Sequence, residues 1–335
     1  MTSSRVPALP GGLLEQIDEL WRRQREHWPM LRAGADDLAT VRVRECRLAD
    51  RCVRIQCNPR RIRSASAKVD PASLAARPCF LCPKNLPEQQ QAVAFRESWW
   101  VLCNPAPIFE PHFVIASRRH EPQRIDAGLD AILDLARAAA GRLTVFYNGP
   151  GAGASAPDHL HLQAIPAGVL PLDAQMARWS AESETCATDE LTWIKREPTS
   201  VGMVSMPSLR AAVFVADDAA EIRNVVSMAL ADLRRVLPAG SEPPINLFAV
   251  LNHEALCVLL VPRRAHRAES FGDGEEQFLV SPGAIDIGGV LITPREIDYH
   301  RLSPLDIAAI YEDVLITTEQ QDAWRNRLER RFSGA

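Results

Sequence analysis

Residues 151–166 read GAGASAPDHLHLQAIP, and the pattern of this stretch predicts both a fold element and a chemistry. His159, His161 and Gln163 stand at every second position, with leucines between them. Alternate side chains of a β-strand share one face, so we expect these three polar groups to point together while the leucines cover a core. The preceding glycines free backbone N–H groups to approach an anion, and Ser155 adds a hydroxyl donor. A phosphate cradle beside paired histidines predicts nucleophilic attack at phosphorus; an exposed strand face that is merely polar is the alternative.

The elements predicted around this stretch occur in the same order twice. The order strand, helix, strand, turn, strand begins at about residue 111 and again at about residue 208. In the second copy ALCVLL stands where HLHLQA stands in the first, and it carries no histidine, so a true repeat leaves the chemistry in the first half. We expect an α+β fold with two pseudo-repeated halves around antiparallel sheet and flanking helices. The halves are residues 1–170, which hold the metal and catalytic motifs, and residues 206–335, joined by a connector over 171–205.

The composition of the chain limits the class of protein that it can be. Its 335 residues are 47% hydrophobic, which is enough for a large core, and a net charge of −4 gives no reason to expect nucleic acid or an anionic membrane as partner. The start lacks the features of a signal peptide, and the longest apolar runs are too short to span a bilayer. Eight cysteines in a chain this long form no disulfide scaffold. We expect a cytoplasmic protein with reduced thiols.

Cys79 and Cys82 form a C-x-x-C pair, which can be a redox pair, half of a zinc site or chance. A thioredoxin-like pair opens a helix after a strand, whereas Pro83 and Pro87 place this pair in a loop. Metal is therefore the favoured interpretation.

Zinc needs two ligands beyond the cysteines, and the first half offers four histidines: His112, His120, His159 and His161. A Cys2His2 set of Cys79, Cys82, His120 and His159 would join three separate segments and anchor the strand that presents His161. For His120, a solvated loop position is the alternative.

Two basic runs allow either a solvated face or a clamp on phosphate oxygens. The first run contains Arg60, Arg61, Arg63 and Lys68, and the second contains Arg263, Arg264 and His266. A solvated face is favoured for both runs, and more strongly for the second.

Taken together, RPCFLCPKN, PHFVIASRRH and YNGPGAGASAPDHLHLQ resemble one branch of the histidine-triad superfamily. That branch includes galactose-1-phosphate uridylyltransferase, diadenosine tetraphosphate phosphorylase and GDP-hexose phosphorylases, which share an H-x-H-x-Q signature. The resemblance covers about residues 57–166 well, and the second half only through its element order and SPGAIDIGGVLITP. It implies that both halves are histidine-triad-like.

The resemblance implies nucleotidyl transfer by double displacement. His161 would attack the α-phosphorus, a phosphate-bearing acceptor would take the covalent nucleotidyl group, and Gln163 would hydrogen-bond the phosphoryl oxygens. The implied substrate-binding residues are Asn148, Gly153, Ser155, Arg60, Arg63 and Asn104. Zinc on the four ligands named above would be structural, because a closed site leaves no open position.

Two departures refine the expectation. Asp158 lengthens the interval before His159, and residue 160 is Leu where the uridylyltransferase has Pro, which is closer to the phosphorylases. We therefore expect a phosphorylase or adenylyltransferase-like enzyme acting on a nucleoside polyphosphate or nucleotide sugar; a homodimer is compatible with the resemblance. The alternatives are a nucleotide hydrolase of the same superfamily and a non-catalytic, zinc-stabilised nucleotide-binding protein.

Overall fold

The computed structural model describes residues 11–62, 70–181, 190–237, 240 and 242–332. The strands are β1 (Arg42–Arg47), β2 (Cys52–Cys57), β3 (Ala92–Phe95), β4 (Trp99–Cys103), β5 (Phe113–Ser117), β6 (Leu143–Asn148), β7 (His161–Pro166), β8 (Leu191–Lys195), β9 (Ser200–Met206), β10 (Leu209–Ala216), β11 (Ile245–Asn252), β12 (Ala255–Pro262) and β13 (Val290–Thr293). The helices are α1 (Leu13–His27), α2 (Pro29–Leu38), α4 (Pro71–Ala75), α5 (Ile125–Ala138), α6 (Pro171–Ala181), α7 (Ala219–Leu233), α8 (Ala284–Ile287), α9 (Glu296–Arg301), α10 (Pro304–Val314) and α11 (Thr318–Phe332), with short 3-10 turns η2 (Pro59–Arg61) and η3 (Pro83–Asn85).

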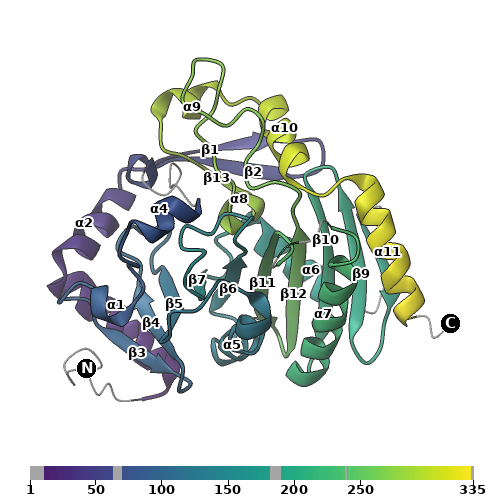
Figure 1. The fold of residues 1–335 in the computed structure, drawn as a ribbon, viewed down its shortest axis with the longest axis horizontal. Helices are drawn as coiled ribbons and strands as arrows, with labels where there is room; N and C mark the ends of the chain where they lie inside the picture. Colours follow the sequence, from purple (N-terminus) through teal and green to yellow (C-terminus); the bar gives the residue numbers. More distant parts are fainter. Residues whose placement is uncertain (1–10, 63–69, 182–189, 238–239, 241, 333–335) are drawn as a thin grey trace.

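Ten strands form one sheet in the order β3-β4-β5-β7-β6-β11-β12-β10-β9-β8. Each of these neighbours pairs in antiparallel fashion, so the expected α+β fold with antiparallel sheet is confirmed. The order β5-β7-β6 on one side of the centre is mirrored by β11-β12-β10 on the other, with α5 and α7 as the corresponding helices (Figure 1). These two three-strand units meet where β6 lies beside β11, and Asn148 is opposite Asn246 in the register of this strand pair.

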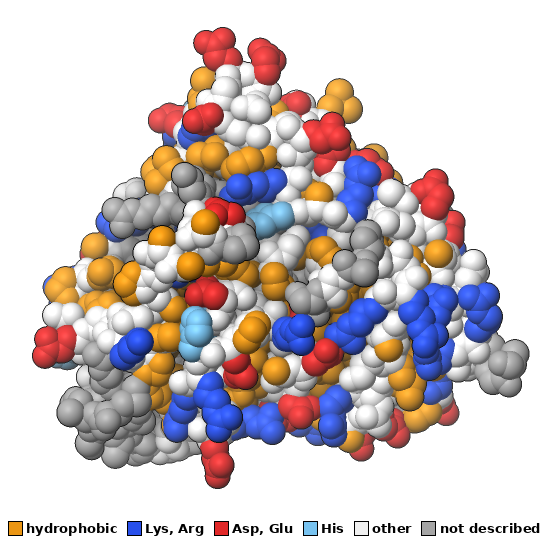
Figure 2. All heavy atoms as spheres, viewed as in Figure 1, with side chains coloured by type: hydrophobic (Ala, Val, Ile, Leu, Met, Phe, Trp, Pro, Cys, Tyr) orange, Lys and Arg blue, Asp and Glu red, His pale blue; other side chains and the backbone are white. Residues whose placement is uncertain are grey.

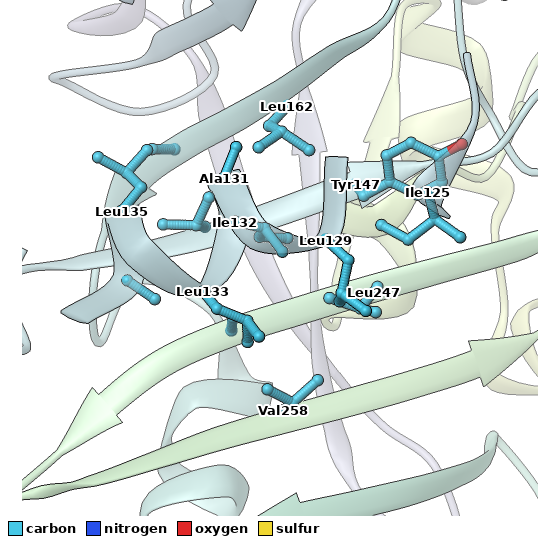
Figure 3. Close-up of a cluster of buried hydrophobic side chains, with 14 of the residues drawn as sticks. Ile125, Leu129, Ala131, Ile132, Leu133, Leu135, Tyr147, Leu162, Leu247 and Val258 are labelled. Atoms are coloured by element: carbon cyan, nitrogen blue, oxygen red, sulfur yellow. The ribbon is translucent and has the colours of Figure 1, made fainter. Parts of the chain in front are cut away.

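Two cores lie on the two faces of this sheet, because successive side chains of a strand point to opposite faces. Tyr147 and Leu247 belong to the core that α1, α5, α7 and α11 cover, whereas Phe146 and Phe248 belong to the core on the other face. Figure 3 shows the apolar side of α5 lying against Tyr147, Leu162 and Leu247 of three neighbouring strands. With Leu162 in this core, its neighbours along β7 face the opposite side of the sheet.

The second face is covered by α6, α8, α10 and a smaller sheet with the order β1-β2-β13 (Figure 1). Within that sheet β13 pairs in parallel with β2, Leu291 opposite Ile55. The C-terminal part of the chain thereby lies over the sheet face of the N-terminal part.

Several elements differ from the sequence-based expectation. Residues 171–205, expected as a connector, include α6, β8 and most of β9, and both strands extend the large sheet. The last part of the chain forms two helices, α10 and α11, and Leu315 between them forms a β-bridge with Arg263. No pattern in the sequence indicated β1 and β2.

Acidic and basic side chains are unevenly distributed over the face drawn in Figure 2. Lys and Arg gather in the lower right part, where Figure 1 places α7 and α11, while acidic side chains stand out at the top. Within the described residues, no helix has both the length and the apolarity needed to cross a membrane.

Candidate active site and metal centre

A cavity of about 430 Å³ opens on the sheet face that carries Phe146. The ends of β6 and β7 line it together with the loop after β6 and parts of residues 28–30, 61 and 80–108. Residues 266–267 and 281–292 of the second half complete the lining. The cavity is therefore built by both halves, although the expected catalytic motif belongs to the first.

His161 presents its imidazole to this cavity from the first residue of β7. Its Nδ1 donates a hydrogen bond to the carbonyl oxygen of His159 over 2.8 Å, which places the proton on Nδ1 and the lone pair on Nε2. Burial lowers the pKa of His161 to about 4. No described residue hydrogen-bonds to Nε2, so an unprotonated ring nitrogen faces the cavity, as a nucleophile requires.

The main chain of His161 is held by the side chain of Gln123, which is buried. Gln123 Oε1 accepts from the His161 N–H over 2.7 Å, and its Nε2 donates to the carbonyl oxygens of His161 and Asn148, both over 2.9 Å. The pairing of β6 with β7 ends at Phe146 and Gln163, so Gln123 joins the two strands where their ladder stops. It lies in a loop before α5, and no pattern in the sequence pointed to it.

Gln163 lines the same cavity and is oriented by His112. The Ile108 N–H donates to Nδ1 of His112 over 3.3 Å, so the His112 proton sits on Nε2, which lies 2.9 Å from Gln163 Oε1 and donates to it. Burial, with Arg61 nearby, lowers the pKa of His112 to about 3, which keeps the ring neutral. With Oε1 held by His112, the amide nitrogen of Gln163 is the group left for the cavity. His112, expected among the zinc candidates, therefore contacts Gln163 instead.

The expected cradle residues Asn148, Gly153 and Ser155 all line the cavity. Gly153 has φ +96°, and a Cβ atom there would lie 2.6 Å from the Cα of Gly283, so this position requires glycine. Among the described residues, no acceptor pairs with the N–H of Gly153 or of Ser155. These two N–H groups are available to an anion.

Cys79, Cys82, His120 and His159 bring their ligand atoms within 4.8 Å of one another. Cys79 Sγ lies 3.4 Å from His159 Nδ1, and Cys82 Sγ lies 3.2 Å from His120 Nδ1. His159 Nε2 donates to the carbonyl oxygen of Ser117 over 2.8 Å, which leaves Nδ1 for a metal. The cluster could therefore bind a metal ion.

His159 does not share the cavity with His161 and Gln163, contrary to the expectation that the three point together. The strand begins only at His161, and the His159 N–H instead closes a turn on the carbonyl oxygen of Ala156. Asp158, the additional residue before the motif, pairs with Arg77 over 3.1 Å and stays out of the metal cluster.

Of the arginines expected to bind substrate, Arg60 is half exposed and forms an ion pair with Asp37. Arg61, one residue further along η2, lines the cavity in its place. Arg63, like Lys68, lies outside the described residues. Asn104 lines the cavity, and its Oδ1 accepts from the N–H of Ala106 over 3.0 Å.

The second basic run is not the solvated face that the sequence favoured. Arg263 is fully buried and His266 lines the cavity, whereas Arg264 remains partly exposed and lies 3.7 Å from Asp313. Arg267, which had no assigned role, also lines the cavity.

Comparisons with known proteins agree with this architecture. Residues 20–166 match a family model described as Domain of unknown function (DUF4922), and comparison with curated proteins finds no match. Among solved structures, yeast Ap4A phosphorylase Apa2 in complex with Ap4A is similar with a TM-score of 0.58 at 16% sequence identity, over 92% of this chain and 99% of that chain. This chain has the Ap4A phosphorylase fold.

A second structure of yeast Ap4A phosphorylase Apa2 has a TM-score of 0.57 at 14% identity, covering 92% of this chain and 96% of the other. A galt-like protein from Arabidopsis thaliana is also similar, with a TM-score of 0.38 at 17% identity over 82% of this chain and 99% of that chain. The two Ap4A phosphorylase structures confirm the expected resemblance at the level of the fold.

Proposed function

We propose that this protein transfers a nucleotidyl group from a nucleoside polyphosphate or nucleotide sugar to a phosphate-bearing acceptor through a covalent intermediate on His161. The observation that carries the proposal is the His161 imidazole, whose proton is held on Nδ1 by the His159 carbonyl while Nε2 faces the cavity. The Ap4A phosphorylase fold supports the class, because structures of that enzyme contain AMP and Ap4A.

The proposed reaction needs no proton transfer at His161. The Nε2 lone pair attacks the α-phosphorus, an N–P bond forms, and the P–O bond to the remaining phosphate or sugar phosphate breaks with both electrons going to the leaving oxygen. The proton stays on Nδ1, where the His159 carbonyl oxygen stabilises the positive charge of the ring. An oxygen of the acceptor phosphate then attacks the phosphorus, and the N–P bond breaks with its electrons returning to Nε2.

The side chain of Gln163 limits which leaving groups the proposed reaction can release. Its amide has no titratable proton to give, so the leaving group must be stable as an anion, as a phosphate is. With Oε1 bonded to His112, the amide nitrogen would donate to the phosphoryl oxygens as their charge increases in the transition state. The N–H groups of Gly153 and Ser155 would bind the same anion from the loop.

We further propose that the cysteine–histidine cluster holds zinc. Bond lengths of about 2.3 Å to sulfur and about 2.0 Å to nitrogen in a tetrahedral site give S···N separations of about 3.5 Å. The observed separations of 3.4 Å and 3.2 Å are close to this value, and the two thiols and two imidazoles match the donors zinc prefers. When bound, the ion would supply a structural link between the Cys79 loop, His120 and the residue whose carbonyl orients His161.

The test is covalent labelling. Wild-type protein is incubated with a panel of nucleoside triphosphates and nucleotide sugars labelled at the α-phosphate, denatured, and assayed for label stable to base and labile to acid, as expected for a phosphorus–nitrogen bond. We expect labelling that His161→Ala abolishes and that His300→Ala, at an exposed histidine of α9, leaves unchanged. Label that persists in His161→Ala would remove His161 from the nucleophile role.

Acceptor dependence separates the reaction types. Product formation that requires added inorganic phosphate or a phosphorylated acceptor supports transfer or phosphorolysis, whereas release at the same rate in its absence identifies a hydrolase. Nucleotide binding without label or turnover across the panel would instead identify a binding protein.

A further inference from the structure

The buried guanidinium of Arg263 has no carboxylate partner among the described residues, although burying an unpaired cation is costly. Its hydrogen bonds go instead to neutral oxygens. Nε donates to Val314, and Nη2 donates to the carbonyls of Ala265 and His266. Nη1 donates to Asn246 Oδ1 over 2.8 Å and to the carbonyl oxygen of Pro282 over 3.2 Å. Asn246 bonds to Asn148, and Pro282 precedes Gly283; both Asn148 and Gly283 line the cavity.

Arg263 fixes the amide orientation of Asn246, a fully buried residue on β11. A guanidinium can only donate, so the atom facing it must be Oδ1, and the Asn246 amide nitrogen faces the other way. That nitrogen donates to Asn148 Oδ1 over 2.8 Å and to the carbonyl oxygen of Ala152 over 2.7 Å. One side chain of the second half thus holds both Asn148 and the glycine-containing loop after β6.

The orientation of Asn148 follows from these bonds. Its Oδ1 accepts from the Asn246 amide and also from the N–H of Ala284 over 2.7 Å, so both lone pairs of that oxygen are used. The Pro282 carbonyl that Arg263 holds lies two residues before Ala284, so the guanidinium acts on Asn148 by two routes. Asn148 lines the cavity, and its amide nitrogen is the group left to face it.

We infer that Arg263 and Asn246 are positioning residues that hold the amide nitrogen of Asn148 toward the phosphate of the bound nucleotide. The inference rests on the proposed function, and it gives the second half of the chain a role in a site whose nucleophile belongs to the first. Without these bonds the Asn148 amide can turn over and present an oxygen, which repels a phosphate.

A double-mutant cycle of Asn148→Ala and Asn246→Ala tests this role. The readouts are the single-turnover rate of His161 labelling and the affinity for AMP and inorganic phosphate measured by calorimetry. Asn148→Ala removes a donor to the developing charge and is expected to lower the labelling rate by about 10²-fold. Asn246→Ala is expected to lower it about tenfold in the wild-type background and less than threefold in the Asn148→Ala background, since its effect passes through Asn148.

Two further variants serve as controls for the double-mutant cycle. Asn252→Ala removes an asparagine of the same strand whose amide contacts Ser180 away from the cavity, and it should leave labelling unchanged. Asn246→Ser, which fills more of the site, replaces Asn246→Ala if thermal melting shows that the latter is unfolded.

Each result decides between the inference and the proposed function. Equal losses from the Asn246 change in both backgrounds, or no loss, overturn the inference while labelling of wild type upholds the proposed function. If wild-type protein binds AMP but is not labelled, the proposed covalent chemistry is wrong. The inference would still be supported in that case if the Asn148 and Asn246 changes had non-additive effects on AMP affinity. Wild type that neither binds nor is labelled overturns both.

Discussion

Replacing Gln163 by Glu and by Ala tests how the amide of this residue faces the substrate. Glu keeps an oxygen acceptor for the His112 N–H, which lies 2.9 Å from Gln163 Oε1, and therefore preserves the buried side of the contact. On the cavity side, however, it exchanges an N–H donor for a carboxylate oxygen. Ala removes the donor without adding a charge. We expect the order of activity to be wild type, then Gln163→Ala, then Gln163→Glu.

The magnitudes follow from the two changes. A hydrogen bond to a charged group contributes about 2 kcal/mol, so Gln163→Ala should lower the labelling rate by about 30-fold. A carboxylate about 4 Å from a phosphate charge, at an effective dielectric constant of about 20, adds a repulsion of about 4 kcal/mol, or a further factor of roughly 10³ while the group is ionised. Lowering the pH protonates the introduced carboxyl group, so Gln163→Glu should recover activity as the pH falls and Gln163→Ala should not.

Rapid-quench measurement of His161 labelling at pH 5.5 to 8 gives these rates, and thermal melting confirms that both variants are folded. If Gln163→Glu is as active as Gln163→Ala at neutral pH, the amide nitrogen does not face the phosphate, and the orientation assigned through His112 is wrong.

Three other changes test separate parts of the structure. Burial raises the pKa of Glu242 to about 7, so the free energy of unfolding should fall as the pH rises from about 4.5 to 7, by up to about 3 kcal/mol; urea midpoints should show this slope and Glu242→Gln should remove it. Gly153→Ala, which would bring a Cβ against Gly283, should slow labelling more than tenfold, whereas Gly168→Ala has the same backbone cost at φ +85° with open space around it and should not. Cys82→Ser should lower the bound metal to well below one per chain by elemental analysis and reduce the melting temperature, and full metal content would contradict the ligand set.

The sequence predicted the parts of the site that depend on local spacing. Strand periodicity placed His161 and Gln163 on one face, and counting zinc ligands selected the four residues that the fold brings together. The first prediction needed only a period of two, whereas the coordination number of zinc called for two histidines and left four candidates in the first half. The predicted strand face began two residues too early, at His159, because the His159 N–H closes a turn on the Ala156 carbonyl and the strand begins at His161.

What the sequence did not predict depends on long-range contacts. Arg60 and Arg61 are adjacent and chemically identical, and only the 3-10 turn η2 decides which one lines the cavity. Arg263 lies in a run that resembles an exposed basic loop, yet it is fully buried because β11 and the segment before α8 close over it. The pairing of β13 with β2 joins residues more than two hundred positions apart, and no local pattern encodes it.

The two similar halves differ in the side chains that they place on the sheet face that carries the cavity. On β7 this face presents His161 and Gln163, whereas on β12 it presents Cys257, Leu259 and Val261, which pack into the core beneath the smaller sheet. These apolar residues of β12 offer no polar group to a substrate, but their burial stabilises the packing of the second half against the smaller sheet. The second half carries a buried cation after β12 and holds Asn246 against Asn148, so in the proposed function one half would supply the nucleophile and the other would orient a donor beside it.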